Sequence, residues 1–252
     1  MKKFIYLTVL ILVCSSVSFA QRETRDLELS ANGIKELEIE AGAGFLKIRG
    51  VEGLKKIEVE AEIVVKGIRK KDIDEFLEDN LELSLEREGK RVVLISTFHH
   101  SRRSRSFFGR RKSALINITV RIPYEMNLVI EDGSGYTEIE NLKGNINIHD
   151  GSGSLTIEKI IGDVDVNDGS GRLEIRDIEG DVEIDDNSGS ILVRDILGSV
   201  YVEDGSGSIT INGVERNVVI GDDGSGGVNI RNVNGKVERH DKRRSRSWRR
   251  NR

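Results

Sequence analysis

Cysteine, proline and tryptophan each occur once in the 252 residues, and histidine occurs four times. The single cysteine, Cys14, excludes a disulfide framework and a cysteine-rich zinc site. The single proline, Pro123, follows a run of alternating residues, and we expect it to end a strand there. With no cross-link to rely on, the fold must be stabilised by packed apolar side chains.

Apolar runs long enough to span a membrane comfortably are also missing. The longest, Phe4–Val13, follows two lysines and precedes Ser18-Phe19-Ala20, which has the form of a signal peptidase site. Residues 1–20 therefore predict a cleaved signal peptide, and hence an exported protein of the periplasm or cell surface that is not transmembrane after cleavage. Cleavage would remove Cys14. Lipidation of Cys14 is the alternative, but a valine stands where lipoprotein signals usually carry a small residue.

Catalytic and metal-binding signals are sparse. His149-Asp150-Gly151-Ser152 contains the residue types of a triad, but consecutive residues at one turn do not converge as a triad does. His99-His100 lacks further ligands, and the Gly-x-Gly stretches lack the strand–turn–helix setting of a phosphate loop. We therefore predict a non-enzymatic protein with no catalytic residue, metal ligand or cofactor. A glycan-processing β-helix enzyme is the alternative, because paired carboxylates on one face can act on a sugar chain.

A short repeat dominates the remainder of the chain. Asp-Gly-Ser-Gly, once Asp-Asn-Ser-Gly, recurs six times at equal intervals, except that the last interval is one residue longer. A fixed period of this kind is typical of stacked coils, in which each unit buries the apolar face of the next. The predicted corner residues are Asp132, Gly133, Gly135, Asp150, Gly151, Gly153, Asp168, Gly169, Gly171, Asp186, Gly189, Asp204, Gly205, Gly207, Asp223, Gly224 and Gly226.

Alternating aliphatic residues after each corner predict two short strands per coil. In the copy at Asp150, Leu155 and Ile157 face inward in the first strand, and Val164 and Val166 do so in the second. Nearly every copy has aliphatic residues at these positions. We predict an all-β fold, a right-handed parallel β-solenoid of about 18 residues per coil, apolar inside and acidic outside, with one short helix in the N-terminal half.

The corner chemistry has two interpretations. Glycine reaches positive φ at little cost, and Asp or Ser can bond to the backbone of its own turn, which favours a self-capped structural corner. The alternative is a row of aspartates that binds calcium or a cationic polymer. Calcium-binding nonapeptide repeats also form a coil of this length, but their Asp follows the glycines, whereas here it precedes them.

Four parts follow along the chain: a signal peptide at 1–20, a β-rich part at 21–130, the regular solenoid at 131–238 and a basic disordered tail at 239–252. Within the β-rich part we expect a degenerate coil at Ala41–Val59, in which Ala-Gly-Ala-Gly replaces the usual corner. A short amphipathic helix at 70–79, a hairpin around Glu88-Gly89 and a basic loop at 99–112 complete it.

Charge is distributed unevenly. From Glu131 to Glu238 the chain has 23 Asp and Glu against 8 Lys and Arg, whereas segments 99–112 and 239–252 are rich in Arg and Ser. These segments either aid solubility, fold back on the protein's own acidic faces, or contact anionic envelope polymers or lipid head groups. Nucleic acid suits the charge, but export argues against it. The candidate anion-contacting residues are Arg102, Arg103, Arg105, Arg110, Arg111, Arg243, Arg244, Arg246, Trp248, Arg249 and Arg250.

The signal peptide, the alternating N-terminal part and the coils of the form DGSG-x-[LI]-x-[IV]…G-x-V-x-[VI] resemble the bacterial "putative adhesin" β-strand-repeat family. The resemblance extends from about Leu27 to Glu238. It implies an exported, envelope-associated interaction or scaffold module, with another protein as a further kind of partner. The family motif is a structural repeat, so it implies no catalytic residue, and it leaves the oligomeric state open.

Overall fold

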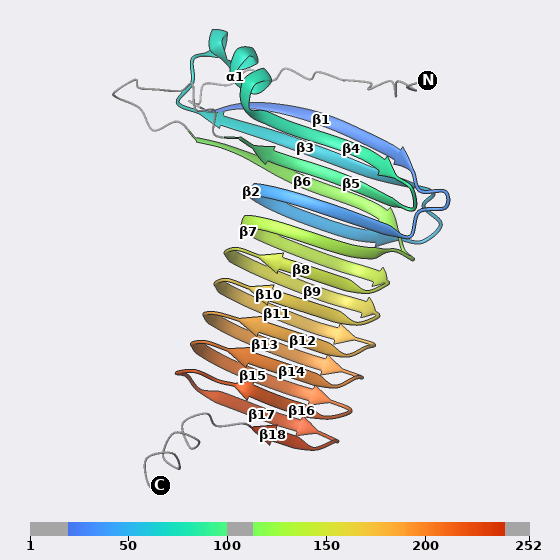
Figure 1. The fold of residues 1–252 in the computed structure, drawn as a ribbon, viewed down its shortest axis with the longest axis vertical. Coiled ribbons are helices and arrows are strands. Elements are labelled where there is room, and N and C mark those ends of the chain that lie inside the picture. The colour runs from blue at the N-terminus through green and yellow to red at the C-terminus, as the bar shows by residue number, and fades with distance from the viewer. Residues whose placement is uncertain (1–19, 100–112, 240–252) are drawn as a thin grey trace, which may run out of the picture.

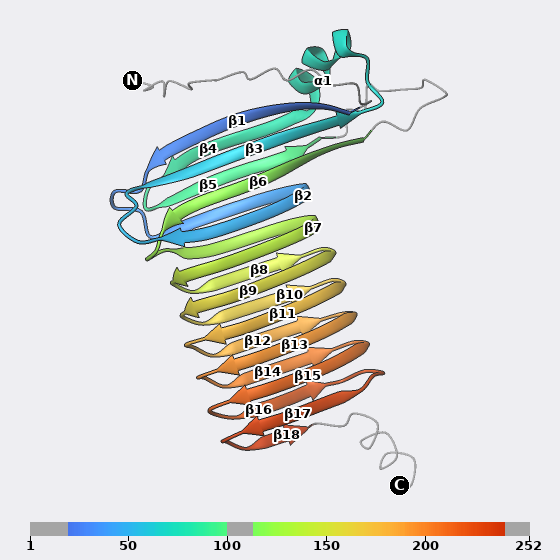
Figure 2. The ribbon, with the colours of Figure 1, turned by 180° about the vertical axis from the view of Figure 1, so that it is seen from behind.

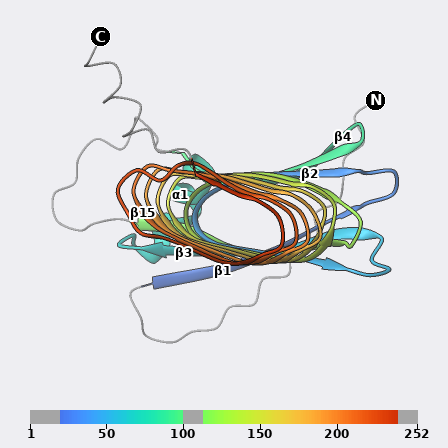
Figure 3. The same ribbon diagram turned by 90° about the horizontal axis from the view of Figure 1, so that it is seen from below.

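A computed structural model of the chain describes residues 20–99 and 113–239. In these ranges the molecule is an elongated stack of strands, with one short helix at the N-terminal end of the stack (Figures 1 and 2). Seen along the stack, the C-terminal coils superpose as a flattened ring (Figure 3). The all-β architecture predicted from the repeat is confirmed.

From Asn127 onward the chain forms a parallel β-solenoid, in which each coil adds one strand to each of two facing sheets. We name the sheets by their strand numbers. The even sheet contains β8 (Ile146–Asp150), β10 (Val164–Asp168), β12 (Val182–Asp186), β14 (Val200–Asp204), β16 (Val218–Asp222) and β18 (Val237–Arg239). The odd sheet contains β9 (Gly153–Ile161), β11 (Gly171–Ile178), β13 (Gly189–Ile196), β15 (Gly207–Val214) and β17 (Val228–Val233).

Strand pairing follows the period of the sequence. Val164 in β10 pairs with Ile146 in β8 and with Val182 in β12, each of which lies one repeat away along the chain. From β8 to β14 each side chain therefore lies above its counterpart in the previous coil, and like residues form ladders along the stack. This register confirms a solenoid of about 18 residues per coil with two short strands in each coil.

Two long strands bend at a corner and so belong to both sheets. They are β2 (Glu36–Val51) and β7 (Asn127–Lys143), which pair in parallel on both sides of the bend. Ala41 lies opposite Asp132, and Gly44 lies opposite Gly135. Ala-Gly-Ala-Gly is thus a degenerate corner, as predicted. The predicted extent of that coil is wrong, however, because Val59 lies in an antiparallel strand outside the stack of coils.

Antiparallel strands extend the stack at its N-terminal end. In the odd-sheet direction, β3 (Lys56–Lys66) pairs with β1 (Ala20–Ser30) and with β6 (Ser113–Pro123), and β6 is parallel to β2. In the even-sheet direction, β5 (Arg91–Phe98) lies beside β2 and forms the predicted hairpin with β4 (Leu81–Glu88). The predicted helix is also present, as a 3₁₀ turn η1 (Lys70–Asp72) that continues into α1 (Ile73–Asn80).

Apolar ladders fill the space between the two sheets. Leu155, Leu173, Ile191 and Ile209 succeed one another in the odd sheet, and each is at most 1% exposed. Burial of this kind stabilises by about 25 cal/mol per Å² of apolar surface removed from water, so the ladders are the main source of stability. The last coil is less protected: β18 is exposed throughout, because no further coil within the described residues covers it.

Candidate functional site

The corner aspartates face the interior of the solenoid. Asp150, Asp168, Asp186 and Asp204 are each 1% exposed, and Asp132 is 6% exposed. Because the corners are in register, these side chains follow one another on successive strands of the even sheet. We call these five residues the aspartate ladder. The expectation of a purely apolar interior with acidic groups outside is wrong at these positions.

One oxygen of each ladder carboxyl is bonded within its own corner. Oδ1 of Asp168 accepts the backbone N–H of Ser170 at 3.0 Å, and Asp150, Asp186 and Asp204 make the same bond at 3.2, 2.9 and 2.9 Å. These are the bonds expected of a self-capped turn. At the top of the ladder, Oδ2 of Asp132 accepts the hydroxyl of the buried Thr137 at 2.6 Å.

The second oxygen is left without a partner on three rungs. Among the described residues, Oδ2 of Asp168, Asp186 and Asp204 is buried and accepts no hydrogen bond. Burial and the neighbouring carboxylates Asp132 and Asp168 raise the pKa of Asp150 to about 7. Burial, with Asp168 and Asp204 beside it, raises the pKa of Asp186 to about 6. Burial also raises the pKa of Asp132, Asp168 and Asp204.

The last corner differs because it comes one residue later than the repeat predicts. A bulge between β14 and β16 shifts the register, so that Glu203 lies opposite Asp222. The carboxylate that accepts the turn N–H, from Gly224 at 3.1 Å, is consequently Asp222. The prediction that Asp223 caps this corner is wrong. Asp223 instead forms an ion pair with Arg239, the last described residue.

The outer side of the even sheet is acidic. The even-sheet segments 127–132, 146–150, 164–168, 182–186, 200–204 and 218–222 contain no Lys or Arg. Acidic side chains project outward from them or from the turns just before them, and we call this surface the acidic face. Its carboxylates are Glu131, Asp163, Asp165, Asp181, Glu183, Asp185 and Glu203.

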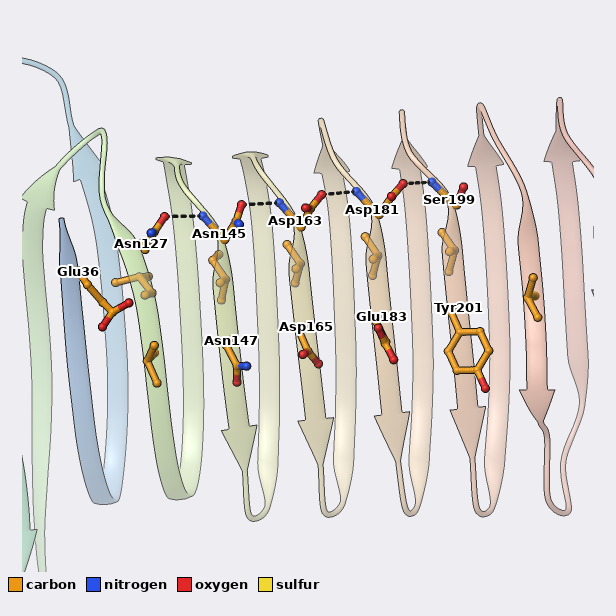
Figure 4. Close-up of a pocket in the computed structure, with 17 residues that line it drawn as sticks. Glu36, Asn127, Asn145, Asn147, Asp163, Asp165, Asp181, Glu183, Ser199 and Tyr201 are labelled. Carbon is orange, nitrogen blue, oxygen red and sulfur yellow. Dashed lines mark hydrogen bonds between the residues drawn. The ribbon is translucent and has the colours of Figure 1, made fainter.

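A shallow groove of about 650 Å³ runs along the acidic face across successive strands (Figure 4). Along one border, each Asn or Asp side chain accepts the backbone N–H of the next coil. These bonds link Asn127 to Asn145, Asn145 to Asp163, Asp163 to Asp181 and Asp181 to Ser199, at 2.7–3.0 Å. A second row in the groove consists of Asn147, Asp165, Glu183 and Tyr201. The groove is thus an array of polar groups that repeats once per coil.

Opposite charges are paired on the outer side of the odd sheet and its extension. Lys47 lies 3.2 Å from Glu138, and Arg49 lies 3.3 Å from Glu140. Glu158 forms ion pairs with Lys159 and Arg176. The two sides of the solenoid therefore differ chemically, with unbalanced negative charge on the even sheet and local charge balance on the odd sheet.

His149 and Asp150, which have the residue types of a triad, do not come together, as the sequence analysis expected. His149 is exposed on the outer side of the even sheet, whereas Asp150 is buried on the inner side. Across residues 20–99 and 113–239, no three His, Cys, Asp or Glu side chains are grouped so that they could hold a metal ion. His99 lies beside Glu82 in the described part. None of the helices there is long and apolar enough to cross a membrane.

The candidate anion-contacting residues lie outside the described residues, as do the predicted signal peptide up to Phe19, the basic loop from His100 to Lys112 and the tail from His240 onward. The sequence reasoning missed the border of Asn and Asp side chains along the groove. The signal was available, since Asn145, Asp163 and Asp181 each follow a glycine at the interval of the repeat. The sequence predicted an acidic exterior, but it did not predict that the unbalanced charge lies on the even sheet alone.

Comparison with known proteins finds no matching family model and no matching curated protein. Solved structures with similarity include a "putative cell adhesion protein" from Clostridium sporogenes, at 15% identity and a TM-score of 0.34, covering 87% of this chain and 99% of that one. A "putative adhesin" from Bacteroides fragilis matches at 16% identity and a TM-score of 0.32, with 87% and 97% covered. A "putative lipid binding protein" from Parabacteroides distasonis matches at 14% identity and a TM-score of 0.30, covering 87% of this chain and 97% of that one. The adhesin names agree with the resemblance noted in the sequence, but likeness at this level carries no argument about the activity of this chain.

Proposed function

We propose that the protein is an exported, non-enzymatic module of the cell envelope that acts by adhesin-like contact or as a scaffold. The observation that carries the proposal is the acidic face, an exposed array of carboxylates and amides on a rigid stack of coils. Such an array suits multivalent contact better than catalysis, because its groups repeat along a shallow surface instead of converging in an enclosed cleft.

Each coil places equivalent groups one strand spacing, about 4.8 Å, from those of the next coil. Asp165 and Glu183 occupy the same position on neighbouring strands, and Asn147 and Tyr201 flank them. A partner with a repeated cationic or hydrogen-bonding group can therefore engage several coils together. Each contact is weak alone, but the contacts act in concert once the first has formed.

The two Arg-rich segments would provide the protein with a second kind of contact surface. Their charge suits anionic envelope polymers or lipid head groups, and the aromatic residues among the arginines suit an interface between water and lipid. The protein would then have contact surfaces of both signs, which is what a scaffold between unlike envelope components requires.

Location is tested by trypsin treatment of intact cells, with a known periplasmic protein as the control. If trypsin cleaves the Arg-rich tail while the cells are intact, the protein lies at the cell surface. Cleavage only after the outer envelope is opened supports a periplasmic position. Persistence of the uncleaved chain in the cytoplasmic fraction would contradict export.

The acidic face is tested by co-sedimentation of the purified chain with envelope fragments. The double variant Asp165→Asn/Glu183→Gln removes two charges from the groove. The control Glu174→Gln/Glu179→Gln removes two charges from the odd-sheet side. We expect at least a several-fold loss of binding in the first variant and little change in the second, because the loss of one contact weakens a multivalent array as a whole. Equal binding by both variants would contradict the role of this face.

Contact of the tail with lipid is tested through Trp248, the only tryptophan of the chain. Vesicles of phosphatidylglycerol should shift its fluorescence to shorter wavelength, and vesicles of phosphatidylcholine should not, because the attraction depends on anionic head groups. No shift with either vesicle would exclude the lipid contact while leaving the acidic-face proposal standing.

A further inference from the structure

The aspartate ladder has no part in the proposed function, because its carboxyl groups are closed off from solvent. Its geometry nevertheless poses an electrostatic problem. Five carboxyl groups stand on adjacent strands inside a parallel sheet, about 4.8 Å apart, and each is 6% exposed or less. Ionised carboxylates at this spacing repel one another, and burial makes each isolated charge costly.

The hydrogen bonds within the ladder do not solve this problem. The turn N–H groups and the Thr137 hydroxyl stabilise one oxygen of a carboxyl. The buried Oδ2 atoms of Asp168, Asp186 and Asp204 accept no hydrogen bond from any described residue. A buried acceptor without a donor costs free energy unless a donor can be supplied.

A proton supplies that donor. A protonated carboxyl group is neutral and carries an O–H, which can bond to the ionised carboxyl on the next strand. A hydrogen bond from a carboxylic acid to a carboxylate is short and strong, and it satisfies an acceptor that the protein leaves open. Alternating neutral and ionised rungs would also reduce the buried charges from five to two or three.

We propose that the aspartate ladder retains protons at neutral pH and shares them between neighbouring rungs through Oδ2, so that the stacking of the coils is stabilised by acid and weakened by alkali. The protonated rungs lie between ionised ones. The titration belongs to the ladder as a unit, since each rung changes the proton affinity of its neighbours.

The surroundings of the ladder contain few other charges. Among the described residues, Asp185 acts on Asp186 from the outer side of the same strand, and Asp222 and Asp223 act on Asp204 from the last coil. Of these, Asp223 is paired with Arg239. All of these neighbours are acidic, so they favour retention of protons on the ladder.

The direction of the pH dependence follows from linkage. A carboxyl group with a folded-state pKa above its unfolded value adds stability that is complete below the unfolded pKa, near 4, and is lost as the pH rises through the folded pKa. Because the pKa of Asp186 is about 6 and that of Asp150 is about 7, this loss of stability falls between pH 4 and 8.

The test combines infrared spectroscopy and urea unfolding on the chain without its predicted signal peptide, residues 21–252. Infrared difference spectra at pH 6 should show the carbonyl stretch of a protonated carboxyl group. The equilibrium constant for unfolding should rise about tenfold or more between pH 5 and pH 8, in keeping with the raised proton affinity of the ladder.

Two double variants locate the effect. Asp150→Asn/Asp186→Asn replaces alternate rungs with neutral amides, whose N–H groups can donate to the remaining carboxylates. Asp165→Asn/Glu183→Gln removes two charges from neighbouring even-sheet strands, but on the acidic face. We expect the ladder variant to lose both the carbonyl signal and most of the pH dependence, and the control to keep both.

A wild-type spectrum without a protonated carboxyl signal at pH 6 would overturn the proposal, whether or not the ladder variant folds. Stability that stays level or rises from pH 5 to pH 8 would also overturn it. So would an equal loss of pH dependence in the control variant, because the proton would then reside on the acidic face.

Discussion

At the scale of single residues, the corners depend on backbone that only glycine can supply. Gly171 has a φ of 142°, and a methyl group on it would overlap the carbonyl oxygen of Gly153 in the previous coil. The last glycine of each regular corner stacks on its counterpart in the same way. The first glycine also stacks closely, since a methyl group on Gly169 would lie 2.3 Å from the carbonyl oxygen of Gly151, but its φ is not positive and Asn187 occupies its place in the fourth corner.

We therefore expect Gly171→Ala to destabilise the fold by about 2 kcal/mol or more, through backbone strain and overlap between coils. Gly169→Asn is the matched control and should cost much less, because Asn187 already stands at the equivalent position. Urea unfolding of both variants measures the difference. Equal losses would show that the stacking of coils sets the same limit on both glycines.

Asp168 shows how burial changes an expectation that rests on turn chemistry alone. An amide at this position keeps the oxygen that accepts the Ser170 N–H and removes a charge from between Asp150 and Asp186. Since burial raises the pKa of Asp168, its ionised form opposes folding at high pH.

Asp168→Asn should therefore change stability little at pH 5 and increase it at pH 8. Thermal unfolding at both pH values measures this difference. A loss of stability at pH 8 would mean that the charge itself is needed at the corner, as it would be for a bound cation.

At the scale of the strand, stability depends on ladders shared between coils. Val182 in β12 is 2% exposed and pairs with Val164 and Val200, so three coils meet at this residue. Glu183, the next residue, points outward into the groove. The alternation of the strand thus separates a packing position from a surface position by one residue.

Val182→Asp should cost about 3–5 kcal/mol, because it places an unpaired charge in the apolar ladder and disturbs the coils on both sides. Glu183→Ala is the control and should change stability by less than about 0.5 kcal/mol. Denaturant unfolding of each variant compares the two costs. A small loss in Val182→Asp would indicate that the coil can expel this side chain without unfolding its neighbours.

At the scale of the whole molecule, the solenoid has unlike ends. The N-terminal end is covered by antiparallel strands and by α1, whose Ile73 and Leu77 are buried. At the C-terminal end, β18 is exposed along its whole length and β17 is only partly buried. A stack in which each coil contacts only its neighbours loses structure first where one neighbour is missing.

Hydrogen exchange should follow this asymmetry. Backbone amides of β17 and β18 should exchange at least about tenfold faster than those of β11 and β13, because opening the last coil exposes little apolar surface. Mass spectrometry of peptides from these strands compares the two regions in one experiment. Uniform protection along the stack would mean that all coils open together as one cooperative unit.

The sequence by itself determined the coil. The fixed period, the aliphatic alternation and the glycine corners are local or periodic features, and each predicts the same parallel stack because identical units satisfy one another best in register. The helix at 70–79 and the hairpin after it were equally predictable, since their signals are local.

The tertiary structure decided how the charges are sorted. The sequence and the structure both place Asp168 in a self-capped turn. Only the structure shows that its carboxyl group is buried between the two sheets, among other carboxyl groups. The end of the first coil at Val51 was likewise settled by pairing with distant strands, because β3 lies antiparallel between β1 and β6 and does not continue the parallel coil. Contacts between distant segments are not encoded in any one stretch of residues, and they depend on which surfaces the whole chain can bury.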